Sequence, residues 1–244
     1  MQTSGTSKVI LLTGASSGIG AACATWLAGQ GHQLVIGARR TERLEALANE
    51  IRNTGGQVTT HTLDVTQQRS VQAFADMAMS EYGRIDVMIN NAGVMPLSPM
   101  IALKIDEWNH MIDVNVRGVL HGIAAVLPSM TAQGSGHIIN ISSIGGLSVV
   151  PTAAVYCATK YAVRAISDGL RQENDSLRVT CVYPGVVESE LANTITDPIA
   201  ADAMKAFRQI ALNPTAIASA IAHVINQPND VDTSEIVVRP TAAL

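Results

Sequence analysis

The chain has 244 residues, a formal net charge of −4 and only 15% charged residues, so we expect one largely buried α/β domain over residues 1–244. Its acidic balance provides no basic face for nucleic acid. The sequence indicates neither a signal peptide nor an apolar stretch long enough to cross a bilayer, which predicts a cytoplasmic protein without a membrane partner.

Short apolar runs typical of buried parallel strands recur along the chain. They cover residues 8–12, 33–38, 57–63, 85–89, 137–141, 178–183 and 235–238. Between them lie segments with helical period, such as Leu44 to Ile51 behind a candidate cap at Thr41, and Val71 to Tyr82 after Thr66. This alternation predicts a Rossmann-like, doubly wound sheet of seven parallel strands with helices on both faces.

A glycine-rich turn follows the first predicted strand and leads into a helix. Its residues are Thr13, Gly14, Ala15, Ser16, Ser17, Gly18, Ile19 and Gly20. A helix N-terminus offers unpaired amides and partial positive charge, which suit a pyrophosphate. We expect Gly14 to allow the tight turn, Gly18 to let backbone approach phosphate, and Gly20 to let the helix lie close to the sheet. A purely structural turn is the alternative.

The end of the second strand decides how a dinucleotide's ribose is recognised. Ala38, Arg39 and Arg40 stand there, and no carboxylate is present to accept from a ribose 2′-hydroxyl. Two guanidiniums suit a phosphate dianion, so the position favours NADP(H) over NAD(H). We expect Arg39 to contact the 2′-phosphate and Arg40 to point away and matter less; a solvated arginine pair is the alternative.

Tyr156 and Lys160 stand four residues apart, which puts both on one helix face with Cβ atoms about 5–6 Å apart. A free phenol has a pKa of about 10, and a nearby ammonium is expected to lower it. Tyr156 could then protonate a carbonyl oxygen as hydride arrives, or deprotonate an alcohol in the reverse direction.

The neighbouring Cys157 could be a redox switch, but a small buried residue is the favoured interpretation for it and for Cys23 and Cys181. The scattered histidines lack metal-ligand spacing, so no metal is expected.

With Asn90, Gly93, Asn115 and Ser143 between them, these motifs make the chain resemble the short-chain dehydrogenase/reductase family from Lys8 onward. The G-x-x-x-G-x-G spacing of the turn is that family's variant. The resemblance implies four catalytic residues. They are Asn115, which holds a water on a proton relay; Ser143, which bonds the reacting oxygen; Tyr156; and Lys160, which also bonds the nicotinamide ribose. Ser142 competes with Ser143, but the family's thirteen-residue spacing to the tyrosine selects Ser143.

The resemblance also implies cofactor contacts beyond the turn. They are Asp64 and Val65 along the adenine, Asn90, Ala92 and Gly93 at ribose and phosphate, and Pro184, Gly185, Val187 and Ser189 beside the nicotinamide. Ser189 stands where the family has threonine. Val94, Met95, Val149, Val150, Tyr183 and Val187 are expected to wall an apolar substrate pocket, although each could be core. Residues 188–213 correspond to the family's mobile lid.

These features predict an NADPH-dependent reductase of small aldehydes or ketones, reversible as an alcohol dehydrogenase. The end of the chain, residues 235–241, resembles that of 3-hydroxy acid/serine dehydrogenases, clavulanate-aldehyde reductases and sulfoacetaldehyde reductases. A substrate with an anionic tail, such as sulfoacetaldehyde or a 3-oxo acid, would then meet Lys205, Arg208 or a neighbouring subunit's Arg239. The alternatives are a hydroxy-acid or alcohol dehydrogenase working oxidatively with NADP, and an NADP(H) sensor without chemistry.

The helices that hold Asn115 and Tyr156 carry apolar and small residues on more than one face. A helix that is apolar all round needs cover on its outer side. In the family these two helices pair across a two-fold axis, so we expect a homotetramer, or a homodimer.

Overall fold

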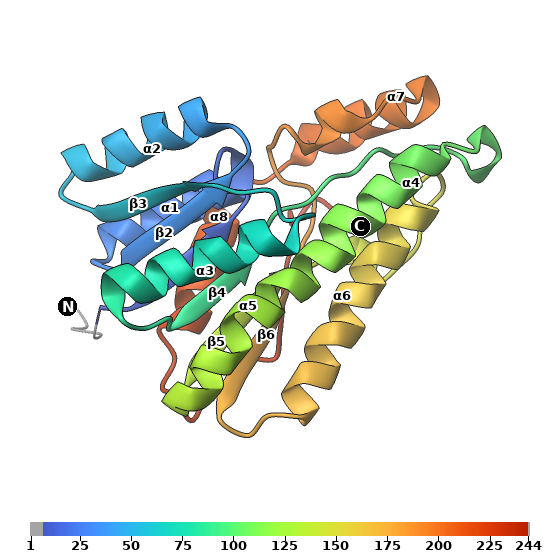
Figure 1. Ribbon diagram of the computed structural model, residues 1–244. Coiled ribbons are helices and arrows are strands. Elements are labelled where there is room, and N and C mark those ends of the chain that lie inside the picture. Colours follow the sequence, from blue (N-terminus) through green and yellow to red (C-terminus); the bar gives the residue numbers. More distant parts are fainter. Residues whose placement is uncertain (1–6, 244) are drawn as a thin grey trace.

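One parallel sheet forms the centre of the molecule in the computed structural model, which describes residues 7–243 (Figure 1). Its strands follow the order β3-β2-β1-β4-β5-β6-β7, and all neighbours pair in parallel. The predicted doubly wound sheet is therefore confirmed. The strands are β1 (Val9–Thr13), β2 (Gln33–Ala38), β3 (Gln57–Thr62), β4 (Val87–Asn90), β5 (Gly136–Ile141), β6 (Leu177–Pro184) and β7 (Glu235–Val238).

Helices cover both faces of this sheet (Figure 1). One face holds α1 (Gly18–Gly29), α2 (Thr41–Asn53) and α8 (Pro214–Ile225). The other holds α3 (Gln68–Tyr82), α5 (Gly118–Gln133) and α6 (Ala154–Gln172). Short helical pieces near the carboxyl ends of the strands are η1 (Met100–Ala102), α4 (Ile105–Ile112), η2 (Asp113–Arg117), η3 (Ile144–Gly146), η4 (Leu191–Thr194), α7 (Pro198–Phe207) and η5 (Arg208–Ile210).

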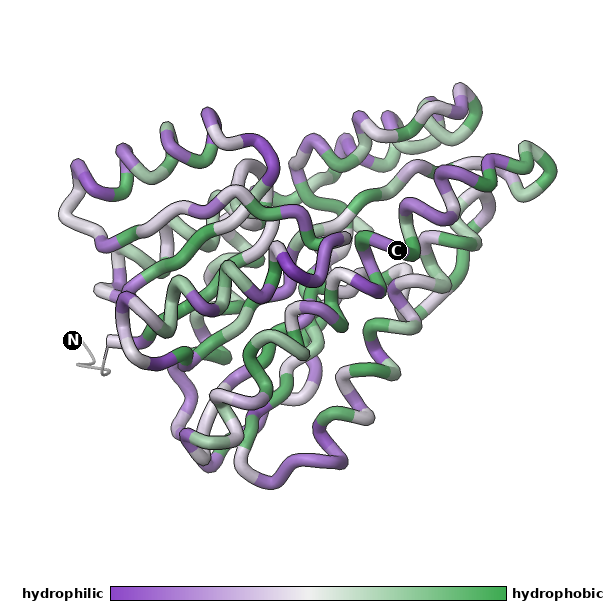
Figure 2. Tube along the Cα trace, viewed as in Figure 1, coloured by the Kyte–Doolittle hydropathy of each residue, from purple (hydrophilic) through white to green (hydrophobic). Residues whose placement is uncertain are grey.

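Burial of both sheet faces explains why the strands are continuous apolar runs. Along β1, Val9 and Leu11 pack into the cluster beneath α3, α5 and α6, whereas Ile10 and Leu12 pack into the cluster beneath α1, α2 and α8. The outer helices need only one apolar stripe each. Figure 2 shows hydrophilic and hydrophobic residues alternating along α2, whose buried residues recur with helical period.

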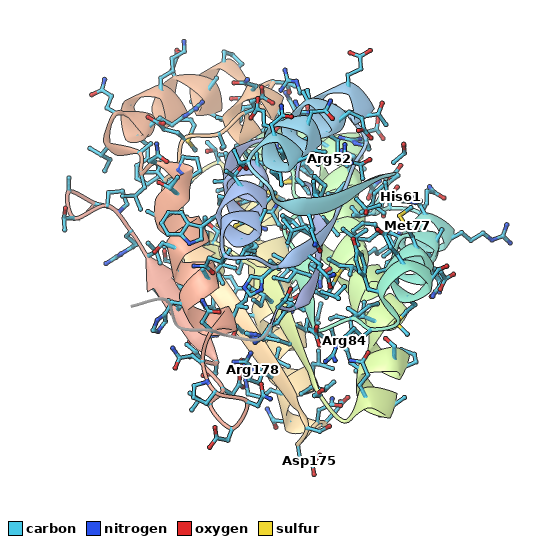
Figure 3. The ribbon with its side chains drawn as sticks, turned by 90° about the vertical axis from the view of Figure 1, so that its left-hand side faces the viewer. Arg52, His61, Met77, Arg84, Asp175 and Arg178 are labelled. Atoms are coloured by element: carbon cyan, nitrogen blue, oxygen red, sulfur yellow. The ribbon has the colours of Figure 1, made fainter. Side chains whose placement is uncertain are left out.

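A buried arginine organises the edge of the sheet where the strands begin. Arg178 lies near the start of β6 (Figure 3), and its Nη1 donates to the carbonyl of Val224 at 3.0 Å while its Nη2 donates to that of Ile225 at 3.3 Å. These carbonyls end α8, where they lack partners within the helix and carry partial negative charge. Arg178 thereby ties β6 to α8 at the edge opposite the candidate site.

One predicted helix start differs from the structure, and the other helix begins after Thr66 as expected. Thr41 is the first residue of α2 rather than its cap, and Arg40 occupies the cap position without a side-chain cap hydrogen bond. Thr66 precedes α3 by two residues, because its amide and hydroxyl both donate to Asp64 Oδ1, at 3.0 and 2.8 Å. This local turn satisfies the polar groups of Thr66 before the helix begins.

The helix that contains Asn115 was not expected in its full length. α4, η2 and α5 form one run of 29 residues over Ile105–Gln133, and its most apolar window has a mean hydropathy of 1.2, which meets the length and composition of a membrane span. The expectation that no apolar stretch reaches this length was therefore wrong. The run packs against α3, β4 and β5, and 44% of its apolar window is buried, so one face lies in the core and the other is exposed.

Candidate active site

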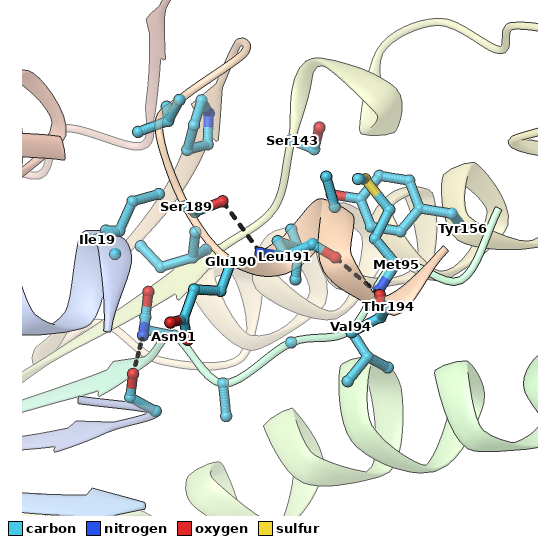
Figure 4. Close-up of a pocket in the computed structure, with 18 of the residues that line it drawn as sticks. Ile19, Asn91, Val94, Met95, Ser143, Tyr156, Ser189, Glu190, Leu191 and Thr194 are labelled. Carbon is cyan, nitrogen blue, oxygen red and sulfur yellow. Dashed lines mark hydrogen bonds between the residues drawn. The ribbon is translucent and has the colours of Figure 1, made fainter. Parts of the chain in front are cut away.

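A cavity of about 510 Å³ opens at the carboxyl ends of the strands, between the glycine turn, the ends of β4, β5 and β6, and the 188–213 segment (Figure 4). Ligands bind at this edge in open α/β sheets, where the strand order reverses. Here the reversal lies between β1 and β4. Predicted site residues that line the cavity are Gly14, Ser16, Ser17, Gly18, Ile19, Arg39, Arg40, Asp64, Val65, Ala92, Gly93, Val94, Met95, Ser143, Val150, Tyr156, Lys160, Pro184, Gly185, Val187 and Ser189.

The glycine turn requires its glycines for backbone reasons. Gly14 and Gly18 have φ angles of +69° and +55°, and a Cβ at Gly14 would lie 2.8 Å from the Cα of Ala92. Gly20 does not line the cavity, and its predicted role is to let the helix lie close to the sheet. A Cβ there would lie 2.4 Å from the carbonyl oxygen of Gly14, so Gly20 makes room for the turn itself.

At the end of β4 the asparagine that lines the cavity is Asn91 rather than the predicted Asn90. Asn90 is buried in the core, where its Nδ2 donates to Asn140 Oδ1 at 2.9 Å, and it does not line the cavity. Asn91 lines the cavity instead, and its Nδ2 donates to the carbonyls of Thr13 and Gly14 at 2.9 and 3.2 Å. Successive side chains at a strand end point to opposite sides, which explains the exchange.

The arginines after β2 both line the cavity, but Arg40 does not point away from the turn as expected. Its Nη2 donates to the hydroxyls of Ser16 and Ser17 at 3.0 and 2.7 Å. Arg39 acts on the pKa of Asp64. Desolvation raises this pKa, but the hydrogen bonds from Thr66 and the charge of Arg39 outweigh it and keep the pKa below its usual value. Both guanidiniums therefore present positive charge at the position predicted for a ribose phosphate.

Three polar side chains meet at the other end of the cavity. Ser143 caps η3, where its Oγ accepts from the amide of Gly145 at 3.0 Å, and its side chain lies at the cavity with the phenol of Tyr156 (Figure 4). The ammonium of Lys160 lies 5.7 Å from the centre of the Tyr156 ring and donates to the carbonyl of Ile141 at 2.9 Å. The competing Ser142 is engaged elsewhere, because its hydroxyl donates to the carbonyl of Lys160 at 2.9 Å.

Burial controls the protonation of this group. Desolvation raises the pKa of Tyr156 to about 12, although the hydrogen bond with Ser143 lowers it in part. Desolvation also lowers the pKa of Lys160 to about 8. Desolvation is the largest cause of the raised pKa of Tyr156, and the expected lowering by the charge of Lys160 is not among its causes. Tyr156 is a neutral phenol and Lys160 is charged at neutral pH.

Asn115 lies in the π-helical piece η2, where it is almost fully buried. Its Oδ1 accepts from the amide of Val94 and its Nδ2 donates to the carbonyl of Val94, both at 2.9 Å, while Nδ2 also donates to Thr159 Oγ1 at 3.1 Å. Asn115 thus fixes the loop after β4 against α6. One-turn π bulges occur often at functional sites, and this one was not predicted.

Two predicted wall residues do not line the cavity. Tyr183 is fully buried in β6, and its hydroxyl donates to Glu235 Oε1 at 2.7 Å, so it belongs to the core rather than to a substrate pocket. Val149 is exposed outside the cavity. Met95 and Val150 do line it, together with residues that the sequence did not single out: Leu97, Ala153, Leu191, Ala192, Thr194, Met204 and Phe207.

The candidate cations for an anionic substrate differ in whether they line the cavity. Arg208 lines the cavity, and its Nη2 donates to the carbonyl of Ser189 at 2.7 Å. Lys205 is highly exposed, pairs with Asp202 at 2.9 Å and does not line the cavity. Arg239 does not line it within this chain either; its predicted contribution from a neighbouring subunit stays a prediction.

The cysteines Cys23, Cys157 and Cys181 are free and buried, as favoured, and desolvation raises the pKa of Cys157, which disfavours a redox thiolate.

Sequence reasoning missed Asn91, Glu190 and Arg43. Asn91 is adjacent to the predicted Asn90, so strand alternation could have identified it. Glu190 and Arg43 form an ion pair at 2.6 Å across 147 positions of the chain, and nothing in the local pattern of either residue indicates that contact.

Comparison with known proteins gives, for most of the chain, the same family that the sequence motifs resemble. Residues 8–200 match the model of the short chain dehydrogenase family. An uncharacterized oxidoreductase of Listeria monocytogenes serovar 1/2a is 46% identical over 240 residues, which cover 96% of this chain and 97% of that protein.

Solved structures share the fold over nearly the whole chain. An alcohol dehydrogenase of the archaeon Thermococcus sibiricus, complexed with 5-hydroxy-NADP, has a TM-score of 0.87 and 32% identity, covering 96% of this chain and 97% of that one. The closed form of a serine dehydrogenase with NADP+ has a TM-score of 0.86 and 32% identity, covering 94% of each chain. A short chain dehydrogenase/reductase of Burkholderia phymatum, in complex with NAD, has a TM-score of 0.87 and 28% identity, covering 95% of this chain and 88% of that one.

Proposed function

Because the chain belongs to the short-chain dehydrogenase family and is an oxidoreductase of that type, we propose that it reduces a small aldehyde or ketone with NADPH, reversibly, in the cytoplasm. The observation that carries this proposal is the buried Tyr156, which lines one cavity with Ser143, Lys160 and the glycine turn, and whose pKa burial raises to about 12. A proton donor beside a dinucleotide site is what carbonyl reduction requires.

The residues present fit a dinucleotide with a 2′-phosphate. The turn leaves backbone amides at the start of α1, which suit a pyrophosphate. The turn itself is tight, because there is no room for a Cβ at Gly14. Ala38 offers no carboxylate to the ribose, and the guanidiniums of Arg39 and Arg40 line the cavity beside it. When bound, NADPH supplies the hydride. Ser189, Pro184 and Gly185 would hold the nicotinamide end.

The other polar side chains would move and position the proton. Ser143 bonds the carbonyl oxygen of the substrate, Tyr156 donates its phenol proton to that oxygen, and the charged Lys160 stabilises the phenolate that remains. Asn115 holds the loop after β4 in place and, by family resemblance, a water that restores the proton. Since burial raises the pKa of Tyr156 to about 12, the donor form that reduction requires predominates at neutral pH.

The substrate end of the cavity supports a small carbonyl compound. Met95, Val150, Met204 and Phe207 provide apolar walls, and Arg208 is the candidate cation that lines it. An anionic tail, as in sulfoacetaldehyde or a 3-oxo acid, would take the free donors of Arg208. A cofactor sensor without chemistry is disfavoured, since Ser143, Tyr156 and Lys160 all stand at one cavity.

We also propose that 188–213 acts as a lid and that the chain forms a homotetramer, or a homodimer, through the outer faces of α5 and α6. Leu120 and Tyr161 are exposed on these helices, as is Val237 on β7, so each surface has apolar area to cover. Sedimentation at micromolar concentration should show assemblies larger than one chain. A lone 25.6 kDa species would refute the assembly.

Tyr156→Phe should lower kcat for carbonyl reduction by about 10²- to 10⁴-fold, because it removes the general acid. Binding of NADPH, followed by its fluorescence, should remain within about twofold because the ring is kept. Tyr82→Phe, at the end of α3 and outside the cavity, is the matched control and should be fully active. Equal turnover by the Tyr156→Phe variant would reject the mechanism.

Reduction should lose rate at alkaline pH. Lys160, with its pKa lowered to about 8, is charged below that pH and neutral above it, so the phenolate loses its stabilising cation as pH rises. We expect kcat/KM to be level from pH 6 to pH 7 and to fall through about pH 8, measured with NADPH saturating. A rate that instead increases between pH 7 and pH 9 is incompatible with this assignment.

Arg40→Met should weaken NADPH by about tenfold or more, since a hydrogen bond to a charged group contributes about 1.5–3 kcal/mol and about 1.4 kcal/mol is tenfold. The affinity for NADH should change little. Arg39→Met should act in the same direction, and Arg69→Met, an exposed arginine on α3, should change neither. The readout is the dissociation constant for both cofactors. A wild type that prefers NADH, or an equal loss for both cofactors, would show that this is no phosphate site.

A further inference from the structure

A carboxylate of the 188–213 segment already occupies the arginines beside the glycine turn. Glu190 Oε2 pairs with Arg40 Nη1 at 2.5 Å, and Glu190 Oε1 pairs with Arg43 Nη1 at 2.6 Å. Both oxygens of one carboxylate are therefore engaged by two guanidiniums that come from the end of β2 and the first turn of α2. The contact spans about 150 positions of sequence between Arg40 and Glu190.

The pairing lies inside the cavity rather than on an unrelated surface. Glu190 and Arg40 line the same cavity as Ser16, Ser17 and Arg39. Arg40 also donates to both serine hydroxyls, so one guanidinium joins the glycine turn to the 188–213 segment. In Figure 4 the carboxylate of Glu190 points toward the side where Ile19 and Asn91 lie, away from Ser143 and Tyr156.

A carboxylate and a phosphate compete for such donors because both present oxygens that match the guanidinium fork. Hydrogen bonds from Arg43 and Arg40 lower the pKa of Glu190 to about 2, so the side chain is ionised throughout the physiological range. Its negative charge neutralises one of the two positive charges of Arg40 and Arg43. A 2′-phosphate must therefore displace Glu190 or bind close to a like charge, and either course weakens its binding.

We propose that Glu190 is a specificity-determining residue that competes with the cofactor's 2′-phosphate for Arg40 and Arg43. This inference rests on the proposed function, in which Arg39 and Arg40 receive the 2′-phosphate of NADP(H). It adds a consequence: binding of a 2′-phosphorylated cofactor releases Glu190 from the arginines, whereas NAD(H) leaves the ion pairs in place. Glu190 therefore reduces the preference for NADP(H) over NAD(H) that the arginines create. It also links the start of the 188–213 segment to the cofactor's 2′-phosphate.

The test is calorimetric titration of the full chain with adenosine 2′,5′-bisphosphate, using AMP as the ligand that lacks the 2′-phosphate. Glu190→Gln should tighten the bisphosphate by about three- to tenfold, in keeping with the modest strength of partly exposed ion pairs, and should leave AMP unchanged. Glu188→Gln is the matched control, because Glu188 is an exposed carboxylate two residues away that does not line the cavity. It should change neither affinity.

A double-mutant cycle separates competition from an indirect effect. If Glu190 acts through the arginines, Glu190→Gln should gain little for the bisphosphate once Arg40→Met and Arg43→Met are present. If the wild type binds AMP and the bisphosphate equally, the proposed NADP(H) site fails. If the wild type prefers the bisphosphate and Arg40→Met abolishes that preference, but Glu190→Gln leaves affinity unchanged or weakens it, the NADP(H) site stands and the competition by Glu190 is overturned.

Discussion

The close approach of the turn after β1 to the loop after β4 is the contact on which the whole site depends. The hydroxyl of Thr13 accepts from the amides of Asn91 and Ala92, both at 3.0 Å, and the Asn91 side chain donates back to the backbone of Thr13 and Gly14. No side chain fits between the two segments at Gly14. This packing holds the start of α1 at the position where the sheet reverses its order, and Asn115 then fixes the next residues of the β4 loop against the helix of Tyr156 and Lys160.

Electrostatics at the two ends of the cavity follow opposite rules. At the Tyr156 end, burial dominates, so the phenol keeps its proton and the ammonium is weakened. At the arginine end, the groups are partly exposed and charge pairing dominates, which keeps Glu190 ionised. The first arrangement suits proton donation to a nascent alkoxide, and the second suits reversible exchange of one anion for another. One cavity therefore combines a buried reaction end with a partly exposed recognition end.

The sequence predicts the fold well, because buried parallel strands leave uninterrupted apolar runs and all seven runs became strands of one sheet. It also predicts which segments meet at the cavity, since the glycine turn and the Tyr156 helix have specific motifs. It is weaker on which way a side chain points: Asn90 and Tyr183 lie in the core, although their neighbours line the cavity. Contacts between distant segments, such as Arg40 with Glu190, and the π turn at Asn115 depend on tertiary packing that no local period encodes.

The central claim is that burial keeps Tyr156 protonated, so that it donates rather than accepts a proton at neutral pH. Phenolate absorbance near 295 nm, recorded against pH for the wild type and with the Tyr156→Phe variant subtracted, measures that proton directly. The account predicts no phenolate from Tyr156 between pH 6 and about pH 10, because desolvation raises its pKa to about 12. A phenolate that appears with an apparent pKa near 7 or 8 would contradict it.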